Sequence, residues 1–139
     1  MPLKVIISEK GKAWKLEFAD EVLSGKSIGD TIDGKELKPE LEGYQLQITG
    51  GSDSSGFPLA KDVEGIGLKK VLLTKGFGMR DRYPGMRRRR TLRGKTITAT
   101  TAQLNLNVLK AGSKPLDAIF SDQNKPKEVT PKPAEKSAA

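Results

Sequence analysis

Eleven basic side chains lie within one short stretch of this chain, residues 69–95. A single acid, Asp81, lies among them, so the stretch carries a net charge of +10, whereas the whole chain of 139 residues carries +8. Such focused positive charge, rich in forked guanidinium donors, attracts a polyphosphate backbone, because each neutralised phosphate releases counterions. The sequence therefore indicates nucleic acid as the partner. The candidate RNA-binding residues are Lys69, Lys70, Lys75, Arg80, Arg82, Arg87, Arg88, Arg89, Arg90, Arg93 and Lys95.

The surroundings of these residues argue against a simple charged tail. Blocks of like charge are commonly solvated faces, disordered segments or nuclear import signals. Here the basic residues are interleaved with Gly, Pro, Met and aromatic residues, and strand-like sequence follows the run Arg87 to Arg90. We therefore predict a basic loop, residues 69–95, anchored in folded structure at both ends. Phe77 and Tyr83 are then available for stacking on bases or for packing beneath the arginines.

A second candidate segment consists of Gly50, Gly51, Ser52 and Asp53. Glycines permit positive φ angles and close backbone approach, while Ser and Asp side chains can cap a turn. Two interpretations stay open. The segment is either a structural turn, with Phe57 filling the core just beyond it, or an RNA contact whose backbone amides touch phosphate or ribose.

Catalytic chemistry has little support in the sequence. The chain has no His and no Cys, which removes serine triads, thiol nucleophiles, disulfides and the common transition-metal sites. Two sequences that end like a phosphate-binding loop, Gly25-Lys26-Ser27 and Gly94-Lys95-Thr96, lack that motif's first glycine. Scattered acids favour solvent-facing turns over a metal-dependent nuclease site: Asp30, Asp33, Glu36, Asp53 and Asp62. We predict a protein that is not an enzyme, with no cofactor, no metal and no small-molecule substrate.

The elements that position these residues are predicted to be short strands. Apolar and polar residues alternate in Trp14–Phe18, Tyr44–Ile48 and Leu104–Val108, and denser apolar or β-branched runs predict further strands at residues 3–8, 70–74 and 94–101. Lys10-Gly11 and Asp33-Gly34 predict turns. Helices are expected to be short, at residues 20–24, 37–42 and 116–121. The fold class is therefore all-β or β-dominated, as a small closed or partly closed β-barrel of about six strands with short helices.

The composition changes near the C-terminus. Residues 122–139 are rich in Pro, Lys, Glu and Ala, which predicts a flexible tail after a β-barrel RNA-binding domain at residues 1–121. No long apolar run or secretory signal occurs in the chain. We therefore expect a soluble cytoplasmic protein without a membrane partner.

Several separated blocks carry a family resemblance. They are Leu46 to Asp53 with Gly56-Phe57-Pro58, Leu72 to Gly76, Arg87 to Arg90 with Arg93-Gly94 and Thr96-Ile97, and Gln103 to Leu106. In order and spacing, residues 1–110 resemble small-subunit ribosomal protein S six of the archaeal and eukaryotic type. The resemblance implies a β-barrel body and a structural role in the ribosome, near the base of the small subunit. The implied partners are small-subunit ribosomal RNA and neighbouring ribosomal proteins.

The resemblance also implies an archaeal source, because the long basic C-terminal helix of the eukaryotic members is missing. A non-ribosomal architectural nucleic-acid-binding protein is the alternative function, because the same focused charge would serve it equally well.

Overall fold

The computed structural model describes residues 2–19 and 22–123, most of which lie in strands or the turns between them. In chain order the elements are β1 (Leu3–Glu9), β2 (Lys12–Phe18), β3 (Thr31–Asp33), α1 (Gly34–Leu37), the 3-10 helix η1 (Pro39–Leu41), β4 (Gln45–Asp53), β5 (Leu68–Leu73), β6 (Arg88–Arg93), β7 (Thr101–Lys110) and α2 (Leu116–Ile119). The predicted β-dominated fold with short helices is confirmed. The predicted tail lies almost wholly outside the described residues.

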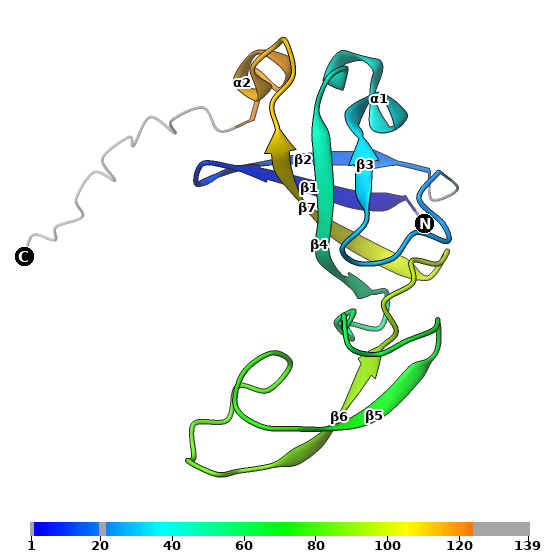
Figure 1. Cartoon of the computed structure of the whole chain (residues 1–139), viewed down its shortest axis with the longest axis vertical. Helices are drawn as coiled ribbons and strands as arrows, with labels where there is room; N and C mark the ends of the chain where they lie inside the picture. Colours follow the sequence, from blue (N-terminus) through cyan, green and yellow to red (C-terminus); the bar gives the residue numbers. More distant parts are fainter. Residues whose placement is uncertain (1, 20–21, 124–139) are drawn as a thin grey trace, which may run out of the picture.

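The strands form two separate sheets (Figure 1). One sheet has the order β2-β1-β7-β4-β3, and the other consists of β5 and β6 alone. Strands β1 and β7 run parallel, and the other paired strands are antiparallel. The prediction of a closed or partly closed barrel is wrong, because neither sheet in the described part of the chain closes on itself. Strands β5 and β6 instead form a hairpin that projects from the larger sheet (Figure 1).

The side chains of β5 and β6 explain why the barrel does not close. A barrel strand must bury every second residue in the interior. Four of the six residues of β6 are arginines, and Leu92 is its one fully buried side chain. On β5, Leu68 and Leu72 remain 47% and 52% exposed. These strands therefore lack the continuous apolar face that would hold them against the edges of the larger sheet.

The larger sheet forms from the alternation seen in the sequence. Leu3, Val5 and Ile7 on β1 are at most 1% exposed, and the residues between them face outward or lie half-buried. Lys10 and Gly11 both have positive φ angles, 46° and 81°, which suits the two-residue turn that joins β1 to β2 with the right-handed twist of the strands. The hairpin turn predicted at this position is therefore confirmed.

The main hydrophobic core lies against this sheet. Its largest fully buried side chains come from β1, β4, β7, α2 and the segments between β2 and β4, namely Leu3, Ile7, Leu23, Ile32, Leu41, Leu46, Ile48, Leu104, Leu106 and Leu116, with Leu59 and Ile97 near the hairpin base. A smaller core of Ala60, Val63 and Leu92 lies under the β5–β6 hairpin. The hairpin therefore has its own apolar support.

Several local predictions differ from the structure. Asp33-Gly34, predicted as a turn, is the start of helix α1, and the helix expected at residues 20–24 is absent from 22–24, while 20–21 lie outside the described residues. Residues 94–100 are not a strand, because most of their backbone hydrogen bonds are divided between two irregular segments, 63–67 and 25–28, and only a single bridge joins Ser27 to Thr96. Phe57 is half-buried and does not belong to the core. The short edge strand β3 was not predicted, since three residues carry too little alternation to stand out.

Candidate nucleic-acid interface

The β5–β6 hairpin brings the candidate RNA-binding residues together. The segment predicted as a loop is a hairpin with a long connecting loop, and its strands hold six of the eleven basic residues. Lys69 and Lys70 lie on β5, Arg88, Arg89, Arg90 and Arg93 on β6, Lys75, Arg80, Arg82 and Arg87 in the connecting loop, and Lys95 just beyond β6. The charge that is focused in sequence is therefore also focused in space.

The pairing register divides these side chains between two faces. Directly opposed residues of antiparallel strands lie on the same face, and alternate residues of a strand share a face. We call one side the core face, because it includes the apolar residues that contact the smaller core; its members are Lys69, Val71, Leu73, Arg88, Arg90 and Leu92. The open face consists of Leu68, Lys70, Leu72, Arg89, Thr91 and Arg93. Both faces of the hairpin thus carry cations.

Asp81, the single acid of the basic stretch, faces two arginines of the core face. Its Oδ2 lies 3.3 Å from Arg88 Nε and 3.6 Å from Arg90 Nη2. Neither contact has hydrogen-bond geometry, and the two arginine side chains remain 51% and 45% exposed. Asp81 is itself 27% exposed with Oδ2 buried, but ion pairs whose cations are this exposed contribute little to stability. Asp81 therefore orients the two guanidinium groups without removing them from solvent.

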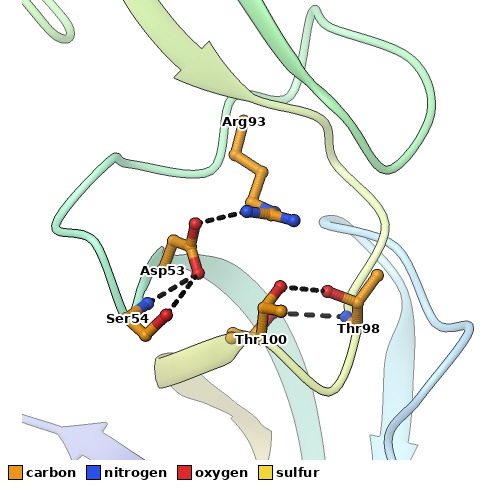
Figure 2. A network of polar contacts seen from close by, with 6 residues as sticks. Asp53, Ser54, Arg93, Thr98 and Thr100 are labelled. Carbon is orange, nitrogen blue, oxygen red and sulfur yellow. Dashed lines mark hydrogen bonds and ion pairs between the residues drawn. The ribbon is translucent and has the colours of Figure 1, made fainter.

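Arg93 has a different environment from the other arginines. Its guanidinium donates to Asp53 Oδ2, and the two side chains are only 13% and 2% exposed. The other oxygen of Asp53 accepts hydrogen bonds from the N–H and the hydroxyl of Ser54, as Figure 2 shows. Arg93 Nε is buried without a hydrogen-bond partner among the described residues. This ion pair joins the base of the hairpin to the end of β4, across 40 residues of sequence that give no hint of the contact.

The Gly50 to Asp53 segment is the last part of β4, where the strand shifts register against β7. Two of its residues have structural roles. A Cβ atom on Gly51 would lie 2.4 Å from the carbonyl oxygen of Gln103, so β4 can approach β7 only with glycine there. The Asp53 N–H donates to the Phe57 carbonyl. These contacts give the segment a structural role as the end of a strand, not as the predicted turn, and the RNA contact stays a prediction.

The other sequence features have local structural partners. Lys95 makes a loose ion pair with Glu64, with 3.8 Å between Nζ and Oε1. Asp30 accepts a hydrogen bond from the Ser27 N–H, and Glu36 pairs with Lys26. In the part of the chain that the structure describes, acidic side chains nowhere gather in groups of three or more that could hold a metal ion. Within the same residues, no helix has the length and apolarity to cross a membrane.

Comparison with known proteins identifies the family of this chain. The family model for ribosomal protein S6e matches residues 1–121. The chain belongs to the ribosomal protein S6e family. Proteins named small ribosomal subunit protein eS6 are similar to it, including one from Methanococcus maripaludis that is 43% identical over 118 residues, or 84% of this chain and 94% of the relative.

Two further archaeal relatives of the same name extend the comparison. The protein from Methanosphaera stadtmanae is 37% identical over 131 residues, which cover 92% of this chain and 99% of the relative. The protein from Methanocaldococcus jannaschii is 42% identical over 110 residues, which cover 79% of this chain and 82% of the relative. The family resemblance that the sequence motifs indicated is therefore confirmed.

Proposed function

We propose that this protein is a structural component of the small ribosomal subunit and that its β5–β6 hairpin, with the connecting loop, binds ribosomal RNA. The observation that carries the proposal is the placement of ten of the eleven basic residues on one projecting hairpin that contains a single acid. Family membership supports the ribosomal setting over a non-ribosomal architectural role. It also supports a non-catalytic protein that acts in the cytoplasm, among neighbouring ribosomal proteins.

In this proposal, exposed cations on both faces of the hairpin contact phosphates. Lys70 and Arg89 approach phosphates from the open face of the hairpin, and Arg88 and Arg90 do so from the core face. Guanidinium groups suit this role because they hold phosphates through two parallel hydrogen bonds. Contacts on both faces fit a hairpin that lies between RNA segments, since RNA is recognised largely through shape and backbone.

Arg93 is assigned a positioning role in place of a direct RNA contact. Its ion pair with Asp53 is largely buried, so the guanidinium already has an anionic partner inside the protein. The pair fixes the base of the hairpin against the end of β4, and this sets the direction in which the hairpin projects. We include residues 1–121 in the RNA-binding domain and residues 69–95, apart from Arg93, in its contact surface.

Replacement of all four residues from Arg87 to Arg90 by Ala tests the proposal. The affinity for small-subunit ribosomal RNA is measured by filter binding at several salt concentrations. Each phosphate contact adds roughly 0.7 to 0.9 to the slope of log affinity against log salt, so the slope should shrink by about 2 to 4. A matched control replaces four exposed lysines of the β1–β2 hairpin, which removes the same charge elsewhere: Lys4, Lys10, Lys12 and Lys15.

The control separates local contact from overall charge. If both variants reduce the slope equally, the arginines act only through the net charge of the protein, and the proposed interface is wrong. An unchanged slope in the arginine variant would lead to the same conclusion.

A further inference from the structure

A pocket of about 280 Å³ lies beside the core face of the hairpin. Its apolar lining includes Val63, Val71, Leu73 and Leu92, with Ala60 and Leu72, and therefore comes from both strands and from the segment that precedes β5. Apolar walls of this kind suit the flat face of an aromatic ring. The pocket thus adds an apolar site to a surface that is otherwise strongly cationic.

Phe77 stands at this pocket and remains 63% exposed. The loop that carries it is fixed on both sides of the ring. Met79 is 2% exposed, and Gly76 and Met79 exchange two backbone hydrogen bonds, of 3.3 Å and 3.1 Å. Gly78, at a φ angle of 77°, packs so closely that an added Cβ would lie 3.1 Å from Leu73 Cδ1. The loop therefore holds an aromatic side chain in solvent next to an apolar pocket.

Two arginines that we propose bind phosphate are the cross-strand neighbours of residues that line the pocket. Arg90 is opposite Val71, and Arg88 is opposite Leu73. Directly opposed residues have Cβ atoms about 5 Å apart. A nucleotide whose phosphates contact these arginines would consequently have its base close to the pocket and to the Phe77 ring.

Asp62 is an acidic residue at the pocket. A surface that only bound phosphates would not favour an acid at this position. It lines the pocket and is exposed, and in the described residues it has no hydrogen bond or ion pair. A carboxylate repels phosphate but accepts hydrogen bonds from the amino groups of a base edge. Guanine, cytosine and adenine carry such groups, whereas uracil has no amino group.

We propose that this pocket binds one unpaired base of the RNA, stacked against Phe77, with its amino edge toward Asp62 and its flanking phosphates on Arg88 and Arg90. The inference rests on the proposed function, because it assumes that the hairpin contacts RNA. It adds a base-binding site to a surface otherwise suited to phosphates. Sequence-tolerant stacking of single bases on aromatic side chains is a common way for proteins to hold unpaired RNA.

Short RNA hairpins of one length serve as probes, one fully paired and four with a single bulged A, C, G or U. The full-length protein should bind the bulged A, C and G probes more tightly than the paired probe. Phe77→Ala should remove this preference, with a loss of about tenfold in affinity for those bulged probes and little change for the paired one. Tyr83→Ala is the matched control, because Tyr83 is a 74% exposed aromatic of the same loop that does not line the pocket.

Asp62→Asn tests the orientation of the base. It should reduce the preference for a bulged guanine over a bulged uracil and leave the paired probe unaffected. Equal affinity of the parent protein for bulged and paired probes would overturn the inference. Equal losses of affinity in the Phe77 and Tyr83 variants would overturn it as well. The pocket would then be better suited to an apolar side chain of a neighbouring protein. If the Arg87 to Arg90 variant also bound every probe as well as the parent, the proposed function itself would fail.

Discussion

Replacement of Asp53 by Ala tests the link between the hairpin and the larger sheet. Asp53 Oδ2 accepts from the Arg93 guanidinium, while Oδ1 accepts from the Ser54 N–H at 2.6 Å and from the Ser54 hydroxyl at 3.2 Å. With Asp53 only 2% and Arg93 13% exposed, water can reach the pair only poorly. Removal of the carboxylate therefore leaves a buried guanidinium whose Nε already lacks a partner among the described residues.

The expected cost follows from this burial. Breaking a buried ion pair by removing one partner typically destabilises a protein by about 3 to 5 kcal/mol, because the remaining charge is left uncompensated. The lost hydrogen bonds to Ser54 are part of the same disruption. At a typical urea m-value of about 1 to 3 kcal/mol/M, the unfolding midpoint should fall by roughly 1 to 5 M.

Urea unfolding followed by tryptophan fluorescence provides the assay. Trp14 is the single tryptophan of the chain and is 3% exposed in the main core, so its emission reports loss of the larger sheet. Asp117→Ala is the matched control, since Asp117 is 58% exposed in its ion pair with Lys12 and such surface pairs contribute about 0 to 1 kcal/mol. Equal midpoints for the two variants would refute the reasoning, because the Asp53–Arg93 pair would then behave as a surface contact.

Two further predictions concern the larger sheet. Gly51→Ala should lower the free energy of unfolding by about 1 to 3 kcal/mol, because its Cβ would lie 2.4 Å from the Gln103 carbonyl oxygen; Gly50→Ala, which meets nothing within 4 Å, should change the urea midpoint little. Burial raises the pKa of Tyr44 above its usual value, so stability should fall as the pH rises above about 10, where the unfolded tyrosine ionises first. Tyr44→Phe should unfold with a shallower alkaline decline, and an identical decline would contradict this.

The strands of the larger sheet were largely predictable, and the way they assemble was not. Alternation in Trp14–Phe18 and Leu104–Val108 marks β2 and β7 because each strand buries one face. The parallel pairing of β1 with β7 joins residues about a hundred positions apart, such as Val5 and Leu104. No local pattern specifies such a pairing. The barrel prediction failed because β5 and β6 form a separate hairpin without the continuous apolar face that closure requires.

The candidate site was also predictable in its position along the chain but not in its structure. Its position in the chain was clear from charge alone, but β6 was missed because the run Arg88 to Arg90 has no apolar alternation and its pairing with β5 decides its structure. The commitment of Arg93 to Asp53 was also invisible, since nothing in the sequence distinguishes Arg93 from the neighbouring arginines. The pocket beside Phe77 depends on how the connecting loop folds back, which only the three-dimensional structure reveals.

Directed hydroxyl-radical cleavage of ribosomal RNA tests the central claim most directly. The chain has no cysteine, so one introduced Cys gives a single attachment point for an iron chelate. Tyr83→Cys places it on the hairpin loop, and Lys35→Cys places it on α1, at the opposite end of the molecule (Figure 1). In small subunits assembled with these proteins, we expect strong cleavage of the small-subunit RNA from position 83 and weaker cleavage from position 35. Strong cleavage from position 35 with none from position 83 would contradict the account.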